Sequence, residues 1–257
     1  MDNQGFKLRV QYKKTGNLRF LSHLEVLRAI ERMVRRADLP FMLSQGFSPH
    51  IRFAFSPALP LAASSEDEYF DLLLDSFIDA ESCLARLQAV SQKDLYPLKA
   101  SFVDVHAPSL SASLTISEYA IELETEKLSL DLIEQGLNAL LEQNYIELFK
   151  KGKMKQIELS ERLPQAPELK PSAMGATLHL YTRSLESGSL RPDIFIDKLA
   201  ESIQKLTNKK LIAERALQFD KLNIAIPFKR YEVFESVGIL RKHQYFENED
   251  GTWDKAL

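Results

Sequence analysis

The sequence predicts an α+β protein made of two tandem ferredoxin-like domains, each with the element order βαββαβ and an antiparallel sheet. Three observations predict this fold. Apolar and polar residues alternate in several short segments, as they do in strands with one buried face. Longer segments between them have apolar residues at helical spacing, and the same order of elements loosely recurs from about residue 107. The expected domains are residues 1–106 and 107–230, and residues 231–257 read as a polar, mobile C-terminal tail.

The first domain begins with a strand at Phe6–Tyr12, whose polar face is basic. A helix follows from Ser22, because Ser22 and Glu25 have the spacing of a capping box. It stops near Asp38-Leu39-Pro40, since proline lacks the amide donor and restricts the residue before it. The apolar side chains of this helix fall on one arc, and the opposite side carries four arginines: Arg28, Arg32, Arg35 and Arg36.

A loop from Ser44 to His50 leads into the remaining elements of this domain. They are strands at about Ile51–Phe55, Tyr69–Leu74 and Leu98–Val105, and a helix at Asp79–Val90 that places Cys83 on its buried side. In the split βαβ arrangement both helices cover one face of the sheet and leave the other open. Arg9 and Arg52 are expected on that open face, where many RNA-binding sheets hold their ligand.

The second domain repeats the pattern less clearly. Strands are expected at Tyr119–Leu123, Thr177–Thr182, Ile212–Phe219 and Leu222–Ile226, helices at Leu130–Glu142 and Asp193–Leu206, a hairpin or one long strand over Tyr145–Leu159, and a proline-rich loop at Pro164–Pro171.

Charge is distributed unevenly along the 257 residues. The net charge is −3, but residues 1–52 contain ten Lys or Arg against four Asp or Glu, which makes this segment +6 and the rest −9. The N-terminal part can therefore attract a polyanion although the whole chain is slightly acidic. One cysteine excludes a disulfide framework and a three-cysteine iron–sulfur motif. With neither a membrane-length apolar run nor a signal-peptide core, the sequence predicts a cytoplasmic protein that does not contact membranes.

Basic and aromatic residues of the first domain predict a nucleic-acid-binding surface. Guanidinium groups match phosphate oxygens in bidentate pairs, and an aromatic ring on a loop can stack on an unpaired base. The alternatives are a solvated helix face paired with Glu25 and Glu31, and a loop aromatic that packs into its own domain. The expected contacts are Lys7, Arg9, Lys13, Arg19, Arg28, Arg32, Arg35, Arg36, Gln45, Phe47 and Arg52.

His23 and His50 flank this surface and are candidates for an acid and a base in RNA cleavage. Their alternative roles are a residue of the first helical turn and the start of a strand. Asp67, Glu68 and Asp71 could hold a cation, but a hydrated strand end is the better explanation. The sequence lacks a Walker loop, a dinucleotide fingerprint, an HExxH motif and a GxSxG elbow, so we predict no cofactor and no bound metal.

The segment RFLSHLEVLRAIERMVRRADLPFMLSQGFSPHIRFAFSPALPL, from Arg19 to Leu61, resembles the bacterial radical-SAM-associated domain family of unknown function, as does GSLRPDIFIDKL from Gly188 to Leu199. The family pattern differs at Ile51, where it has proline, and at Ala62, where it has glycine. The resemblance implies work with a radical SAM enzyme as a partner. The chain itself has no cluster-binding cysteines, so it can only assist such an enzyme.

These observations predict an RNA-binding accessory protein, for tRNA or ribosomal RNA, that works with a radical SAM partner. Two alternatives remain open. The first is a metal-independent endoribonuclease, by architectural analogy with CRISPR RNA-processing enzymes, and fold alone does not establish that function. The second is a protein–protein interaction module whose basic face binds an acidic partner.

Overall fold

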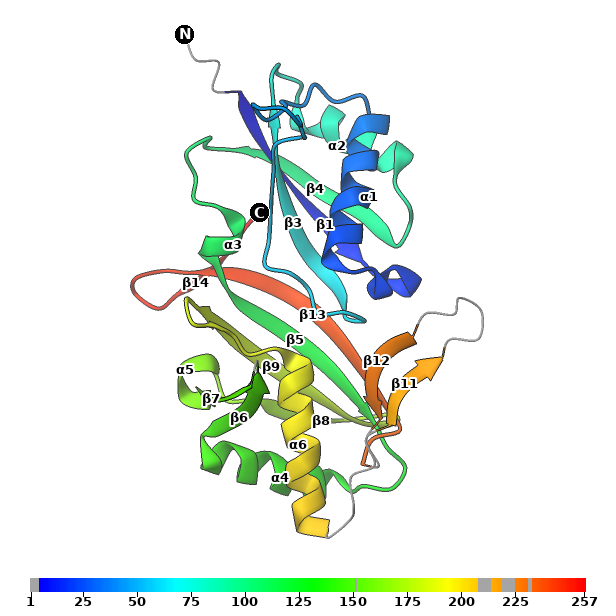
Figure 1. Cartoon of the computed structure of the whole chain (residues 1–257), viewed down its shortest axis with the longest axis vertical. Helices are drawn as coiled ribbons and strands as arrows, with labels where there is room; N and C mark the ends of the chain where they lie inside the picture. Colours follow the sequence, from blue (N-terminus) through cyan, green and yellow to red (C-terminus); the bar gives the residue numbers. More distant parts are fainter. Residues whose placement is uncertain (1–4, 151, 208–213, 219–224, 231–232) are drawn as a thin grey trace. The chain divides into compact units, whose positions relative to one another are not determined.

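The computed structural model describes residues 5–150, 152–207, 214–218, 225–230 and 233–257. The protein is a mixed α/β structure, with about 30% of its residues in helices and about 40% in strands, and its sheets are largely antiparallel (Figure 1). The chain divides into two compact units. Unit 1 comprises Met1–Ser117 with Arg241–Leu257, and unit 2 comprises Glu118–Leu240.

This division differs from the predicted boundaries at residues 106 and 230. The predicted tail contains a long strand, β13 (Ser236–Glu247), and a short one, β14 (Trp253–Lys255), which pair with each other. From Arg241 onward the segment belongs to unit 1. The tail prediction was wrong because β13 buries the polar side chains Arg241 and Gln244, and a strand with polar residues on its buried face lacks the usual alternation.

Unit 1 has the βαββαβ element order expected from the sequence. β1 pairs with both β3 and β4, and β2 pairs with β3, which gives the antiparallel order β4-β1-β3-β2, with β13 also beside β3. A 3-10 helix at Gly16–Phe20 follows β1. The elements are β1 (Phe6–Lys14), α1 (His23–Arg36), β2 (Phe53–Phe55), β3 (Ser64–Leu74), α2 (Ala80–Val90) and β4 (Leu95–Val103).

The predicted start and stop of α1 are both present. The Ser22 hydroxyl accepts a hydrogen bond from the backbone N–H of Glu25, and the Glu25 carboxylate accepts one from the Ser22 N–H at 2.8 Å. Asp38 then takes a left-handed conformation with φ of 50°, which ends the helix before Pro40. The capping box therefore sets where the arginine-bearing helix begins.

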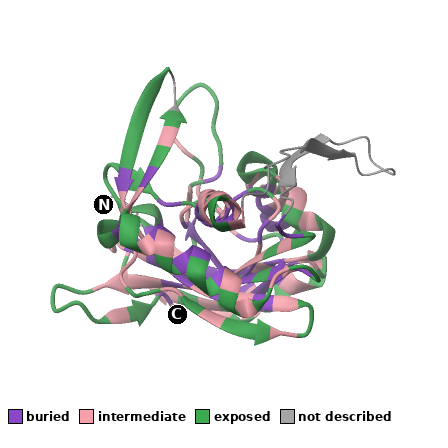
Figure 2. Cartoon of the chain, turned by 90° about the horizontal axis from the view of Figure 1, so that it is seen from below, coloured by how far each residue is buried: buried purple, intermediate pink, exposed green. Residues whose placement is uncertain are grey.

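The core of unit 1 lies between α1, α2 and one face of the sheet. Buried positions occupy the inner sides of the helices and the strands, and loops are mostly exposed (Figure 2). The predicted burial of Cys83 is confirmed. The core includes Leu8, Val10, Val26, Ile30, Met33, Val34, Phe70, Leu72, Leu74, Cys83 and Leu87.

The opposite face of this sheet was expected to be open, but part of it is covered. A short helix, α3 (Leu110–Ser113), the start of β5 (Leu114–Glu124) and the C-terminal residues form a small apolar cluster around Tyr69. Its members are Tyr69, Leu110, Leu114 and Ala256, with Phe246 and Leu257 packed against them. Only a part of the face can therefore receive a ligand.

Unit 2 has its core between two helices and a sheet in which β9, β5 and β13 are neighbours in that order. The segment predicted to be a proline-rich loop contains most of β8, and β8 pairs with β9. None of the described helices is long and apolar enough to cross a membrane. The elements are α4 (Leu130–Gln143), β6 (Tyr145–Lys150), β7 (Lys153–Glu158), α5 (Leu159–Arg162), β8 (Glu168–Ser172), β9 (Gly175–Leu185), β10 (Gly188–Ser189), α6 (Pro192–Thr207), β11 (Glu214–Gln218) and β12 (Ala225–Arg230).

The predicted helices and the strands at Tyr119–Leu123 and Thr177–Thr182 are all present within a few residues. Of the two alternatives for Tyr145–Leu159, the structure has the hairpin, because among the described strands β6 and β7 pair with each other and with no other strand. β11 and β12 form another two-stranded sheet. The rest of the predicted strands near them, at 212–213, 219 and 222–224, falls outside the described residues.

The contact between α4 and α6 depends on a glycine. A Cβ atom added at Gly136 would collide with the side chain of Ile203 and come within 3.3 Å of its backbone nitrogen. Both positions are buried in the core of unit 2. The two helices can therefore approach closely only while residue 136 lacks a side chain.

We expect Gly136→Ala to lower the free energy of unfolding by about 1 to 3 kcal/mol, the usual cost of overpacking a core. Helix propensity alone would favour alanine by about 1 kcal/mol, so the sign tests the close contact. Urea denaturation followed by circular dichroism measures the change. Asn138→Ala, at an exposed position of the same helix, is the matched control, and a stabilised Gly136→Ala would contradict the packing.

Candidate nucleic-acid interface

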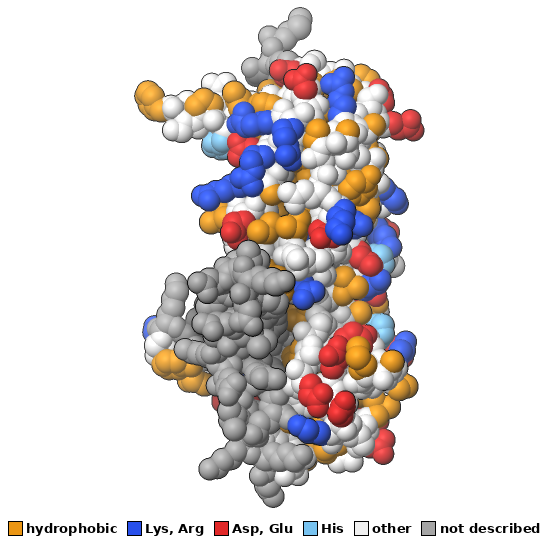
Figure 3. Space-filling model, turned by 90° about the vertical axis from the view of Figure 1, so that its right-hand side faces the viewer, with side chains coloured by type: hydrophobic (Ala, Val, Ile, Leu, Met, Phe, Trp, Pro, Cys, Tyr) orange, Lys and Arg blue, Asp and Glu red, His pale blue; other side chains and the backbone are white. Residues whose placement is uncertain are grey.

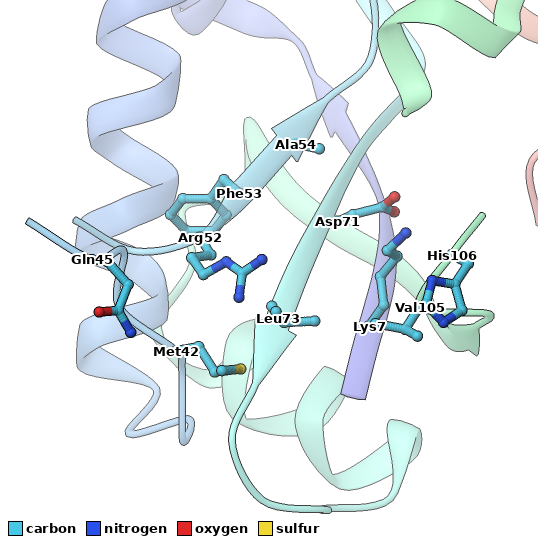
Figure 4. Close-up of a pocket in the computed structure, with 10 residues that line it drawn as sticks. All are labelled: Lys7, Met42, Gln45, Arg52, Phe53, Ala54, Asp71, Leu73, Val105 and His106. Carbon is cyan, nitrogen blue, oxygen red and sulfur yellow. The ribbon is translucent and has the colours of Figure 1, made fainter. Parts of the chain in front are cut away.

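A pocket of about 760 Å³ lies on the face of the unit 1 sheet that α1 and α2 leave uncovered. Alternation along β1 and β3 directs Lys7, Asp71 and Leu73 to this face, because their neighbours enter the core. Figure 4 shows Arg52 on one side of Leu73 and Lys7 on the other. The lining residues are Lys7, Met42, Gln45, Arg52, Phe53, Ala54, Asp71, Leu73, Val105 and His106.

The charges in this pocket leave it net positive. Asp71 accepts two hydrogen bonds from Arg9, at 2.8 Å from Nε and 3.0 Å from Nη2, so a buried guanidinium balances its carboxylate. Lys7 donates one ammonium hydrogen to the carbonyl of Ala107 at 2.9 Å. Its other two ammonium hydrogens are available to a ligand. Arg52 is exposed and has no ion pair among the described residues. Two cations are therefore available to an anion above an apolar floor.

A hairpin, residues Phe41–Arg52, forms one wall of the pocket. Backbone hydrogen bonds tie its stem to β3: Met42 N–H donates to Leu73 O at 2.8 Å, and Leu73 N–H donates to Arg52 O at 3.2 Å. Near its tip, the Ser44 hydroxyl accepts from the backbone N–H of His50 at 3.1 Å. Phe47 is fully exposed, so this aromatic ring does not pack into its own domain. The hairpin therefore exposes the Phe47 ring, and backbone hydrogen bonds to β3 hold the base of the hairpin in place.

The arginines of α1 lie on the other side of the sheet from the pocket. Arg28 and Arg32 are exposed and have no ion pair among the described residues, but Arg35 bonds Glu31 at 2.8 Å and stacks on Phe41. Arg36 donates to the carbonyl of Val90. Figure 3 shows Lys and Arg side chains gathered on one face of unit 1. Local contacts therefore hold two of the four arginines.

The other predicted contacts have different surroundings. Lys13 is half-buried with its ammonium 5.8 Å from the Tyr96 ring centre, and Arg19 is exposed and stacks on Phe20 at 4.7 Å. Gln45 lines the pocket. Arg9 is only 4% exposed, so the expectation that it lies on an open surface was wrong. Its guanidinium is used inside the protein, between Asp71 and the ring of Phe246.

The two candidate catalytic histidines do not form a pair. His23 packs edge-on against Phe55, with ring centres 6.1 Å apart, and burial lowers its pKa below the usual value. His50 bonds within the hairpin, to Ser44 and Ser48. The two rings thus have different neighbours, and no contact between them is present among the described residues.

Sequence reasoning missed several pocket residues. His106 was not among the predicted contacts, yet it lies in the pocket with Val105, and Met42 and Leu73 supply apolar surface. The alternation of β1 and β3 could have placed Leu73 on the face of the sheet that points away from the core. Nothing in the sequence indicated that the segment after β4 returns beside Lys7.

Asp67, Glu68 and Asp71 are not a hydrated strand end, because all three are buried. Asp67 accepts hydrogen bonds from Tyr69 at 2.5 Å, from Gln11 at 2.6 Å and from the backbone of Gln244 at 2.7 Å. Glu68 pairs with Arg241 at 2.9 Å. Among the described residues no group of three His, Cys, Asp or Glu side chains could hold a metal ion. Ion pairs therefore balance Asp71 and Glu68, and hydrogen bonds from neutral groups compensate Asp67.

Lys14 is a further buried cation beside this network. It is 3% exposed, and its ammonium donates to the carbonyl of Leu21 at 2.8 Å. Burial lowers the pKa of Lys14 from 10.5 to about 8, the carboxylate of Glu68 opposes this change, and Arg241 adds to it. The folded protein therefore releases the Lys14 proton more easily than the unfolded chain does.

This difference predicts a pH dependence of stability. Between pH 8 and 10.5 the unfolded chain keeps a proton that folded Lys14 has lost, so the contribution of Lys14 to the unfolding free energy rises with pH. We expect the wild-type value minus that of Lys14→Met to increase over this range, on the order of 1 to 3 kcal/mol. Urea titrations at several pH values measure it. Parallel pH curves for the two proteins would contradict the lowered pKa.

Comparison with protein families gives a match over most of the chain. The model described as an uncharacterised protein conserved in bacteria (DUF2344) matches residues 7–192. The matched segment includes every residue of the pocket, from Lys7 to His106. This description does not mention radical SAM enzymes or RNA. A comparison with curated proteins finds no match.

Proposed function

The chain belongs to this family of uncharacterised bacterial proteins, and we propose that it binds RNA, holding a single-stranded stretch in the pocket of unit 1 and on the Phe41–Arg52 hairpin. The ligand we infer is a nucleotide of a longer strand. Its phosphate meets the two cations of the pocket, and its flat base meets apolar surface.

The observation that carries this proposal is the pairing pattern of the pocket's charges. Arg9 satisfies Asp71 in a bidentate salt bridge, so Arg52 and Lys7 face the pocket with no balancing carboxylate from the part of the chain that the structure describes. Nucleic-acid backbones are recognised chiefly by such cations. The volume of about 760 Å³ is within the range of about 300 to 1,000 Å³ that small-molecule sites occupy.

The hairpin and the far wall supply groups suited to a base. An exposed aromatic ring such as Phe47 can stack on a neighbouring unpaired base, an interaction worth roughly 1 to 3 kcal/mol. Gln45 and His106 have polar atoms that can reach base edges, the usual target of side chains that read single-stranded RNA. These groups favour a single strand over a duplex in this pocket, because a paired base has its edge and faces occupied.

The arginines of α1 support a second, less specific contribution. Arg28 and Arg32 extend the positive field of residues 1–52 on the other side of the sheet. Contacts of this kind strengthen binding to any polyanion without reading its sequence. We therefore assign them to non-specific attraction of RNA.

We expect the double variant Lys7→Ala/Arg52→Ala to bind a labelled single-stranded RNA at least about tenfold more weakly at 0.15 M salt. The log–log slope of affinity against salt should decrease by about 1.4, or about 0.7 for each lost phosphate contact. Fluorescence anisotropy over a series of salt concentrations measures both quantities. Phe47→Ala should lower the affinity with little change in slope, because stacking involves no charge.

Two comparisons make this test specific. Lys93→Ala/Lys205→Ala removes two exposed lysines elsewhere and should leave affinity nearly unchanged. Arg28→Ala/Arg32→Ala should lower affinity equally for all RNA sequences. Unchanged affinity and slope in Lys7→Ala/Arg52→Ala would overturn the pocket assignment. If capture of an acidic protein partner, resistant to nuclease, depends on the same two residues, the surface is a protein-docking site.

The partner we infer for this RNA-bound protein is a radical SAM enzyme, and the support for it is the resemblance of Arg19–Leu61 alone. We expect a tagged protein to co-purify with such an enzyme from bacterial extract, with a lower yield after nuclease treatment if RNA bridges the two proteins. Mass spectrometry of the captured proteins, with a tag-only control, tests the association. Absence of any radical SAM enzyme from the captured set would remove the partnership from the proposal.

For unit 1 we further propose a ferredoxin-like fold, and we propose the same fold for unit 2. The support is the strand order β4-β1-β3-β2, with α1 and α2 against one face. The later strands of unit 2 do not repeat this order among its described residues, so the proposal for that unit rests on the order of its elements in the chain.

A further inference from the structure

The strand β4 forms an edge of the unit 1 sheet (Figure 1). Among the described strands it pairs only with β1, in a register that runs from Val103 opposite Lys7 to Leu95 opposite Lys14. The edge of a sheet presents backbone N–H and C=O groups that can bond to another strand. β4 therefore has a side to which a further strand can be added.

The hydrogen bonds of β3 determine which residues of β4 face that side. Leu73 uses its N–H and its carbonyl on the Phe41–Arg52 hairpin, so both groups point away from β1. Bonded and non-bonded pairs alternate along an antiparallel ladder, so Lys7, opposite Leu73, directs its own N–H and carbonyl toward Val103 on β4. Every second residue before Val103 then also faces β1. The residues whose backbone groups point outward are Leu98, Ala100 and Phe102.

Large apolar side chains are exposed along the same edge. Leu98 is 37% exposed, Phe6 40% and Phe77 62%. The half-buried ring of Phe102 lies 6.3 Å from the Phe6 ring and 5.3 Å from the Phe77 ring, between ring centres. Alternation directs Leu98 and Phe102 to one face of the sheet, the face that α2 covers. The edge thus combines outward backbone groups with apolar surface at each end.

The sequence of β4 is complementary to itself in an antiparallel arrangement. When two copies are centred on Ala100, Leu98 of each copy lies opposite Phe102 of the other, so apolar side chains meet. Lys99, which is exposed on the other face, then lies opposite Ser101. Like charges directly opposite each other are destabilising, and this register avoids them. The strand that fits the edge best is therefore β4 of a second copy.

Other registers of the same pair fit less well. A register must shift by an even number of residues to keep the outward groups paired. Centring the pair on Leu98 places Pro97 inside the paired segment, although proline has no N–H and the Pro97 carbonyl already accepts from the Gln88 side chain at 3.0 Å. Centring it on Phe102 brings in Asp104, which lies outside the strand. The central register gives the longest ladder.

We propose that the protein forms a symmetric dimer in which the β4 strands of two copies pair antiparallel about Ala100. The unit 1 sheets then join into one sheet, and the same surface of each copy forms the contact, so the assembly closes at two copies. The proposal is independent of the proposed function, because Leu98, Ala100 and Phe102 do not line the RNA pocket. Both copies turn the same face of the joined sheet to the same side, which places their two pockets on one side of the dimer.

The first test is sedimentation velocity of the full-length protein over a range of micromolar concentrations. We expect a concentration-dependent dimer, and Ala100→Pro should raise its dissociation constant at least about tenfold, because proline removes an outward N–H. The bonds to β1 do not use that N–H. Leu98→Glu should have a similar effect, because it places a carboxylate against Phe102. Ser101→Ala, at an exposed position of the same strand, is the matched control and should dimerise normally.

A cysteine pair tests the register itself. In Lys99→Cys/Ser101→Cys the two introduced thiols lie opposite each other across the dimer in non-bonded pairs, with Cα atoms about 4.5 Å apart, within the range of a disulfide. Mild oxidation should therefore give a covalent dimer on a non-reducing gel. Each single variant should give none, because its thiols are diagonal neighbours about 7 to 8 Å apart. The native Cys83 is buried.

Several outcomes would overturn the dimer. A wild-type protein that stays monomeric at every concentration excludes it, as does a dimer that Ala100→Pro and Leu98→Glu leave equally tight. Covalent dimers from a single cysteine variant, with none from the double variant, exclude the register. A monomer that captures a different protein through Ala100 would assign the edge to another partner. Circular dichroism checks folding, and if Ala100→Pro does not fold, Leu98→Glu and the cysteine pair decide.

Discussion

The burial of three carboxylates on β3 is the constraint on which unit 1 depends. A buried carboxylate is costly unless charges or hydrogen bonds compensate it, and Asp67, Glu68 and Asp71 are each compensated differently. Arg9 forms a bidentate bridge, Arg241 an ion pair, and Asp67 accepts several neutral donors. Removing one partner would leave an uncompensated charge, which typically costs about 3 to 5 kcal/mol. Two of these carboxylates have partners on β13, because Arg241 pairs with Glu68 and the backbone of Gln244 donates to Asp67.

The same constraint decides which cations remain for a ligand. Arg9 was as plausible a phosphate contact as Arg52 in the sequence, since both lie on the polar side of a strand. Only Arg9 has an acidic cross-strand neighbour, because the β1–β3 register places it opposite Asp71. Arg52 is exposed beside the pocket, with no ion pair among the described residues, and keeps its charge for solvent or a ligand. Pairing inside the protein thus shapes the positive surface as much as composition does.

Local patterns predicted most of the elements and part of the pocket. The capping box at Ser22 and Glu25, the helical spacing of α2, α4 and α6, and the alternation in β1 follow from rules that act over a few residues. The strands predicted to be a tail and the partial cover over Tyr69 depend on contacts between distant segments, such as Arg241 with Glu68, which local patterns do not show. Lys7, Gln45 and Arg52 were identified by residue type. His106 could not be, because its place depends on the path of the chain after β4.

The position of Arg241 in the chain has a consequence for how the protein is made. Domains begin to fold from the N-terminus during synthesis. The ribosome makes Glu68 173 residues before Arg241, whose guanidinium pairs with the Glu68 carboxylate. Until β13 emerges, unit 1 lacks the strand beside β3 that carries Arg241, the ion-pair partner of Glu68. Unit 1 therefore begins to form first but is completed only after β13 has been made. A chain truncated before Arg241 would leave the Glu68 carboxylate, near the N-terminus, without this ion-pair partner.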